Sequence, residues 1–218
     1  GTFGEDCAAK YGFTRAEQDA FATASVERAK AATASGAFAA EITPVTVKSR
    51  AGETVVSVDE GPGKVKLDKI ASLKPAFKKD GTITAASSSS INDGAAALVM
   101  MRASTATKLG CKPLARIVGH ATHAQEPEWF ATAPLGATQK ALAKAGWSVG
   151  DVDLWEINEA FAVVPMALMK ELNLPHDKVN VNGGACALGH PIGASGARIL
   201  VTLLHALQAR GKKKGLAT

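Results

Sequence analysis

Apolar and polar positions follow two rhythms along this chain, one typical of helices and one typical of strands. Where apolar or small residues recur every three or four positions, the pattern predicts one face of a helix. The first such stretch opens with Thr14 and Glu17, which have the spacing of a capping box, and closes at Gly36. The helical pattern predicts helices over Phe13–Gly36, Leu67–Leu73, Ala103–Leu109, Leu135–Ala145 and Ala160–Leu172, the last strained by Pro165, and one that carries Ile199, Leu203 and Leu207.

A period of two predicts strands. Glu41–Val47 and Thr54–Val58 alternate on either side of Arg50–Glu53, which predicts a hairpin. Further along, strand patterns alternate with helical ones, an order typical of a parallel or mixed sheet with helices on its faces. We therefore expect an α/β protein. The other predicted strands are Ile83–Ala85, Leu114–His120, Val152–Ile157 and Val179–Val181, and a last one begins at Gly215–Thr218; Asp59–Lys66 is predicted to be a loop.

A run of four serines, Ser87–Ser90, lies in the middle of the chain. Serine runs are usually linkers. This one stands between a predicted strand and the apolar segment Ala95–Met101, which we expect to be buried. A structured loop facing a ligand is therefore favoured.

Composition narrows the class of protein without naming a function. The chain has 218 residues, enough for one large domain or parts of two, with 46% hydrophobic and 21% charged residues. A net charge of +5 is mild: it is compatible with an anionic small-molecule ligand but selects none. Three Trp and one Tyr, with no basic block among aromatics, argue against nucleic acid.

The cysteines and histidines indicate the compartment and argue against a metal. Three cysteines without a CxxC pair indicate a reducing interior. We find no signal peptide and no apolar run long enough to span a bilayer, so we expect a cytoplasmic protein with no membrane partner. His120 and His123 would point to opposite faces of a strand, which argues against a metal site.

The chemistry centres on His190. It stands between Gly189 and Pro191 in a glycine-rich loop that joins the strand Val179–Val181 to a helix. Glycines let the backbone approach a ligand closely, and proline restricts the residue before it. An imidazole held on a rigid loop at a strand-to-helix junction is suited to acid/base chemistry or to binding an oxyanion.

Three sequence blocks carry a resemblance to a known family. GGACALGHPIGASGAR, residues 183–198, closely resembles the C-terminal signature of thiolases. Asn158-Glu159-Ala160-Phe161 is similar to their NEAF motif, and Ile91-Asn92-Asp93-Gly94-Ala95 to their NDGA turn. The resemblance implies the layered αβαβα fold, incomplete, with a mixed sheet and an inserted lid region. It divides the chain into a lid region at 1–90, the tail of the N-terminal half at 91–113 and the C-terminal half, without its final strands, at 114–218.

The resemblance also implies roles for individual residues. The histidine that matches His190 helps to form the thiolate nucleophile and then hydrogen-bonds the thioester oxygen. The asparagine that matches Asn158 holds the water that completes the oxyanion hole, and Glu159 is expected to orient Asn158 or that water. The remaining positions match coenzyme A contacts: Ser89 to the pantetheine arm, Ala85, Phe130 and Phe161 to the pantetheine or acyl pocket, and Lys64 to a phosphate.

The implied reaction is the condensation of two acetyl-CoA to acetoacetyl-CoA, or its reverse, with coenzyme A esters as substrates and no further cofactor. We expect the complete parent subunit to form a homo-oligomer. The two family cysteines would lie before Gly1 and after Thr218, so we expect this chain to be inactive alone. Two alternatives stay open: a non-catalytic acyl-CoA- or lipid-binding module, and a thioester hydrolase that uses Cys186 with His190.

Overall fold

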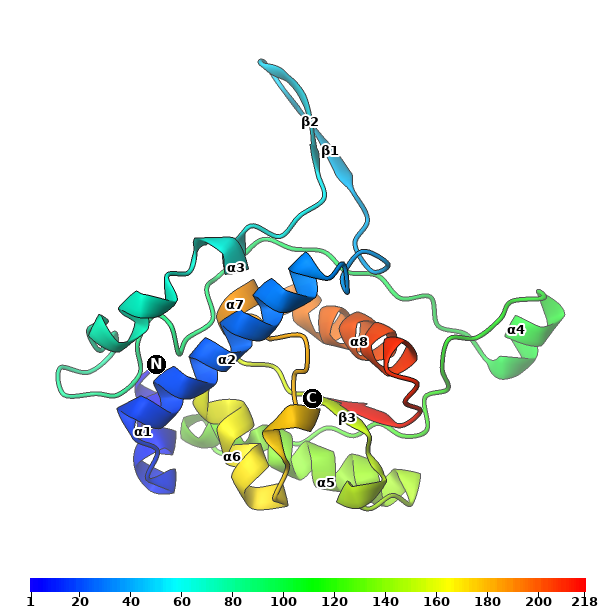
Figure 1. Cartoon of the computed structure of the whole chain (residues 1–218). Helices are drawn as coiled ribbons and strands as arrows, with labels where there is room; N and C mark the ends of the chain where they lie inside the picture. The colour runs from blue at the N-terminus through cyan, green and yellow to red at the C-terminus, as the bar shows by residue number, and fades with distance from the viewer.

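The computed structural model describes residues 1–218 as a body of helices around one short parallel strand pair. A hairpin projects from this body, and the short helix α4 lies apart from it at the end of extended segments (Figure 1). The helices are α1 Thr2–Tyr11, α2 Arg15–Ala34, α3 Gly61–Lys64, α4 Ala103–Lys108, α5 Ala133–Ala145, α6 Val163–Leu172, α7 Ala185–Leu188 and α8 Ile192–Ala209; the 3-10 helices are η1 Leu67–Ser72, η2 Pro127–Thr132, η3 Val149–Asp151 and η4 His176–Lys178.

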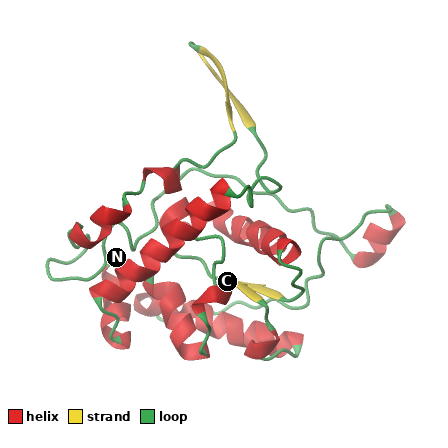
Figure 2. Ribbon diagram, viewed as in Figure 1, coloured by secondary structure: helices red, strands yellow, loops and turns green.

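Two strand pairs are present, and Figure 2 shows them as the yellow ribbons. Strand β1 (Val45–Ser49) runs antiparallel to β2 (Gly52–Val56), with Val45 opposite Val56. All ten of these residues are exposed, which fits the projecting hairpin. The predicted hairpin is confirmed. Strand β3 (Leu154–Glu156) runs parallel to β4 (Gly215–Ala217) inside the body.

Strand β3 organises the core because its two faces meet different helices. Trp155 is 1% exposed and packs with Ile157 in a cluster that includes Leu142 of α5 and Leu168 of α6. Leu154, on the other face, packs with residues of α8: Leu203, Ala206 and Leu207. Side chains alternate across a strand, so β3 lies between α8 and the α5/α6 layer, as an α/β class predicts.

Several helix boundaries follow from their capping residues. Thr14 accepts a hydrogen bond from Glu17 N, and Glu17 accepts one in return from Thr14 N, so the predicted capping box of α2 is confirmed. Gly146 ends α5 in a left-handed conformation. The sequence reading missed α1, which Gly12 ends in the same way.

Helix α8 is the most apolar long helix of the chain. Its inner side packs on β3 and β4, and Ser195, Ile199 and Leu203 are buried. By length and composition alone it could cross a membrane: its 18 residues have a mean hydropathy of 1.2, and 33% of them are buried. The expectation that no apolar run reaches this length was therefore wrong.

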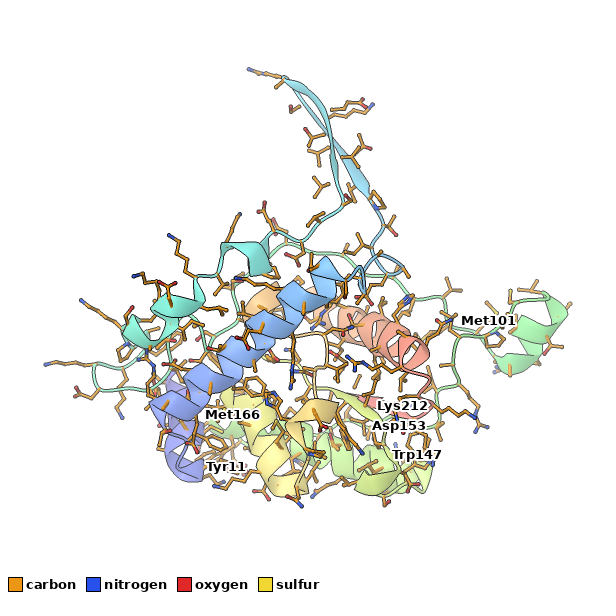
Figure 3. The ribbon with its side chains drawn as sticks, in the orientation of Figure 1. Tyr11, Met101, Trp147, Asp153, Met166 and Lys212 are labelled. Carbon is orange, nitrogen blue, oxygen red and sulfur yellow. The ribbon has the colours of Figure 1, made fainter.

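The segments on either side of α4 correct two other predictions. Residues 91–101 and 112–125 make no hydrogen bond to another backbone group. Val99, in the stretch expected to be buried, is 87% exposed, and Leu114, expected to begin a strand, is 74% exposed. Met101 stands beside α4, away from the core (Figure 3). These segments are extended, but no neighbouring strand pairs with them, so they form no sheet.

Side-chain hydrogen bonds explain why two other predicted strands are absent. At Ile83–Ala85, Thr84 N donates to Ser87 Oγ and Ala86 N donates to Thr84 Oγ1, which replaces a strand ladder. At Val179–Val181 only Val179 bridges to Trp155, and Asn180 has a φ of 47°.

Two further details of the helices differ from the sequence reading. Asp59–Lys66, predicted to be a loop, contains the one-turn helix α3. Helix α6 begins at Val163, so Pro165 lies in its first turn. A proline there removes no intrahelical hydrogen bond and causes no strain.

Candidate active site

The glycine-rich loop before α8 takes its shape from contacts with the protein interior. Gly183 has a φ of 81° and Gly189 a φ of 86°. A Cβ on Gly183 would meet Ser25 O and Ala29, one on Gly184 would meet the Glu159 carboxylate, and one on Gly189 would meet Asn92. No larger residue fits these positions without displacing a neighbour. The loop is therefore held rigidly where it presents His190.

One ring nitrogen of His190, Nδ1, contacts Ser195, and the other, Nε2, is available to accept a proton. Its Nδ1 lies 2.6 Å from Ser195 Oγ, which donates to Pro191 O at 3.1 Å. When the hydroxyl proton is used in that donation, the ring carries its proton on Nδ1, and Nε2 is left as an acceptor. Burial lowers the pKa of His190 below 6.5, and the nearby Arg198 lowers it further. The neutral ring can accept a proton at Nε2.

Asn158 meets His190 from the end of β3. Its Nδ2 lies 3.4 Å from His190 Nε2. Asn158 N donates to Thr218 O, so the strand pairing extends to this residue. Asn158 lies well ahead of the first residue of α6, so it is not the N-cap of that helix. The two side chains expected to act together are thus brought together.

Glu159 holds the loop to the rest of the body. The side chain is fully buried and accepts three hydrogen bonds: from Ser25 Oγ at 2.7 Å, from Asn180 Nδ2 at 2.8 Å and from Cys186 N at 2.9 Å. Asn180 in turn bonds both backbone groups of Ile157. None of these hydrogen bonds goes to Asn158, so the expected role of Glu159 in orienting Asn158 or the water stays a prediction.

Cys186 is poorly placed to be a nucleophile. Its thiol lies 4.0 Å from Glu159 O, to which it donates. Burial raises the pKa of Cys186, and the Glu159 carboxylate raises it further. A reactive thiol needs a depressed pKa or a base in contact, and Cys186 makes no hydrogen bond to His190. The geometry disfavours the Cys186/His190 hydrolase.

The serine loop is structured and joins both motifs. Ser89 donates to Ala160 O through both its backbone N at 3.1 Å and its Oγ at 3.0 Å. Ser90 O accepts from His190 N at 2.9 Å. The loop therefore lies between the NEAF segment and the His190 loop, as a ligand-facing loop would.

Of the other predicted coenzyme A contacts, Phe130, Phe161 and Ala85 lie near the serine loop, whereas Lys64 lies apart from it. Phe161 forms edge-to-face pairs with Phe130, at 6.3 Å, and with Phe77, at 5.7 Å, and its backbone bridges to Ser88. Ala85 is exposed at the start of the serine loop. Lys64 points to solvent with its side chain 70% exposed and pairs with Glu60 at 2.7 Å. No contact joins Lys64 to the other predicted residues.

The histidine pair noted in the sequence does not form a site. Residues 120–123 are not a strand, and His123 bonds Gln125 and Lys140 through its two ring nitrogens. No cluster of three or more His, Cys, Asp or Glu side chains has the arrangement of a metal site.

Two residues that support the site were missed. Ser195, which holds His190, lies in the signature only five residues after it. Ser25, which binds both Glu159 and Gly184 N, interrupts the apolar face of α2 between Phe21 and Ala29. A polar residue at a core position of a helix is a signal of a buried hydrogen bond. That signal could have identified Ser25.

The fold and these motifs define a member of the thiolase family. The family "Thiolase, N-terminal domain" matches residues 1–104, and "Thiolase, C-terminal domain" matches residues 111–218. The chain belongs to the thiolase family. It has the mixed α/β fold of that family in part, as the sequence resemblance implied.

The similar proteins are acetyl-CoA acetyltransferases and related thiolases. The chain is 56% identical to the acetyl-CoA acetyltransferase of Chromobacterium violaceum over 220 residues, which are 100% of this chain and 56% of the relative. It is 52% identical to that of Paracoccus denitrificans, with the same coverage. The crystal structure of the Bacillus anthracis acetyl-CoA acetyltransferase matches with a TM-score of 0.96 and 47% identity, over 99% of this chain and 55% of that one. The chain thus spans about half the length of the curated relatives it matches.

Proposed function

We propose that this chain forms the oxyanion-binding part of an acetyl-CoA acetyltransferase. The reaction is the condensation of two acetyl-CoA to acetoacetyl-CoA, or the reverse thiolysis. The observation that carries the proposal is the approach of His190 Nε2 to Asn158 Nδ2 at 3.4 Å, with the imidazole held by Ser195. The names of the relatives, at 50–56% identity over the whole chain, support the choice of substrate.

In this proposal His190 acts twice. Its neutral Nε2 takes the proton of an attacking thiol, and the resulting N–H then donates to the thioester oxygen as negative charge develops there. The Asn158 amide supports the same oxygen, through the water that the family resemblance implies. Ser89, Ala85, Phe130 and Phe161 line the pantetheine side, and Lys64 offers a point charge to a phosphate.

We also propose that the 218-residue chain alone does not transfer acyl groups. Burial raises the pKa of Cys7 to about 11, and Cys186 is held against Glu159. Neither thiol is therefore suited to form a thiolate, and the exposed Cys111 follows α4, which lies apart from the body. Thiolysis of acetoacetyl-CoA by material of verified 22.4 kDa mass would contradict this. The homo-oligomer and the cytoplasmic location stay predictions.

The experiment uses a chimera in which this chain replaces the matching 220 residues of the Chromobacterium violaceum relative. We expect the chimera to cleave acetoacetyl-CoA, and His190→Ala to lower its kcat by ~10²-fold or more without changing its melting temperature. His120→Ala, at an exposed histidine, is the control. A folded His190→Ala chimera with near-normal kcat would refute the assignment. Coenzyme A binding by an inactive chimera would instead favour a binding module.

A further inference from the structure

A polar stripe, buried at both ends and half-buried at Arg198, runs along the inner side of α8, behind the proposed active site. Ser195, Arg198 and Thr202 lie at the spacing of one helix face. Each contacts a different polar partner: Ser195 the His190 ring, Arg198 the Glu156 carboxylate and Thr202 the Glu41 carboxylate. The stripe is unexpected in a helix whose other inward residues are apolar. It connects His190 with charged groups that the proposed mechanism does not use.

The side of β3 that faces α8 carries the residues that meet this polar stripe and its neighbours. Leu154, Glu156 and Asn158 are two residues apart in extended backbone, so they leave β3 on the same side. Leu154 packs on the far end of α8, Glu156 meets Arg198 in its middle, and Asn158 meets His190 just before it. Arg198 and Glu156 therefore lie directly behind the His190–Asn158 pair.

The pairing of Arg198 with Glu156 is not arranged for stability. Arg198 Nη1 lies 3.7 Å from Glu156 Oε2, beyond hydrogen-bond distance, and Glu156 is 2% exposed. Neither carboxyl oxygen of Glu156, nor Arg198 Nη1, nor Asn158 Oδ1 has a hydrogen-bond partner in the protein. Unpaired buried polar atoms cost free energy, and a loosely matched buried ion pair does not recover it. Such costs are typical of groups retained for function.

We infer that Arg198 and Glu156 are positioning residues for the His190–Asn158 pair: they fill the space directly behind it, between α8 and β3, and Arg198 lies one helical turn after Ser195, which holds the His190 ring. The positive charge of Arg198 also lowers the pKa of His190. Burial raises the pKa of Glu156 to about 8, although Arg198 opposes this, so near neutral pH its charge does not cancel that of Arg198. The other charged group beside the stripe is Glu41, and Asp93 lines an open depression with Pro191 beside the His190 loop. The catalytic consequence rests on the proposed function, but the effect on the His190 proton does not.

The first test measures the His190 proton directly in the 218-residue chain. Diethyl pyrocarbonate modifies unprotonated imidazole, so the pH at which the His190 peptide becomes half as reactive reports its pKa. We expect Arg198→Met to move this midpoint upward, because a positive charge is removed, and Arg198→Lys to restore most of the wild-type value. Arg210→Met, which removes an exposed charge from just beyond α8, is the matched control and should leave the midpoint unchanged.

A midpoint that does not move in Arg198→Met would overturn the inference, as would an equal movement in Arg210→Met. Should Arg198→Met fail to fold, Arg198→Gln removes the same charge and keeps polar contact with Glu156, and the same criterion applies to it. Circular dichroism of each variant decides which one is used.

The second test uses the chimera. We expect Arg198→Met and Glu156→Ala, which removes the side chain behind the pair, each to lower kcat by on the order of 10²-fold with little change in KM, because the reacting groups are misplaced while the substrate contacts remain. In Arg198→Met the acidic limb of the kcat/KM profile should also move to higher pH. Unchanged kcat in either variant would refute the positioning role. An inactive unmodified chimera would count against the proposed function alone, since the first test still decides the role of Arg198.

Discussion

Replacing Glu159 by Gln should destabilise the chain far more than its nearly unchanged size suggests. All three partners of the Glu159 carboxylate are donors: Ser25 Oγ and Cys186 N bond Oε2, and Asn180 Nδ2 bonds Oε1. A glutamine places an NH₂ group at one of these two oxygens. The Ser25 hydroxyl can rotate to accept, but neither Cys186 N nor Asn180 Nδ2 can. One buried donor is left unpaired in either orientation.

The size of the effect follows from counting these bonds. An unsatisfied buried donor costs ~1 to 3 kcal/mol, and each of the two remaining bonds loses about 1 kcal/mol of charge assistance. We therefore expect Glu159→Gln to lower the free energy of unfolding by about 3 to 5 kcal/mol. Urea unfolding followed by Trp fluorescence, at two protein concentrations, measures it; Trp155 reports well because it is 1% exposed.

Glu128→Gln is the matched control, because Glu128 is exposed. Its free energy of unfolding should stay within about 0.5 kcal/mol of the wild-type value. If Glu159→Gln stayed within the same margin, the three hydrogen bonds would not be what holds the loop, and the account of the site would need another anchor.

Three other expectations are simpler to test. In the chimera, isothermal titration should show coenzyme A binding weakened less than about fivefold by Lys64→Ala, because an exposed ion pair is screened, and more by Ser89→Ala; the opposite ranking would contradict the proposed contacts. Iodoacetamide should label Cys111 well before the other two cysteines, whose pKa values are raised by burial, and simultaneous labelling would be inconsistent with this. The pKa of His176 lies below 6.5, mainly because the ring is buried, so the unfolded chain takes up this proton first and stability should fall as pH drops below about 6.5. His176→Phe should flatten that decline and His120→Ala should not, as urea titrations at several pH values would show.

The parts of the fold that could be predicted are those whose signal is local. The α2 capping box depends on Thr14 and Glu17 alone, three residues apart. The His190 loop could be recognised from its own glycines and proline, which lie beside it in the sequence. The prediction of sheet strands at Leu114–His120 failed because alternation identifies extended backbone but says nothing about a partner strand, and none lies beside this segment.

The supports of the site could not be predicted for a related reason. Ser25 and Glu159 are 134 residues apart in sequence, and only the folded chain shows that they share a hydrogen bond. Asn180 sits in an alternating apolar stretch that indicates a strand, yet its side chain bonds both backbone groups of Ile157 and turns the chain away. Such long-range polar pairing overrides local propensity.

The glycine positions of the signature have a consequence for how thiolase-like sequences are recognised. At Gly183 and Gly184 a side chain is excluded by Ser25, Ala29 and Glu159, all of them parts of the protein interior and none of them a substrate. The requirement for glycine there comes from folding and would persist in a descendant that had abandoned catalysis. A search that relies on these glycines therefore detects shared ancestry, whereas His190 and Asn158, the residues of the proposed mechanism, are the positions to inspect when activity is the question.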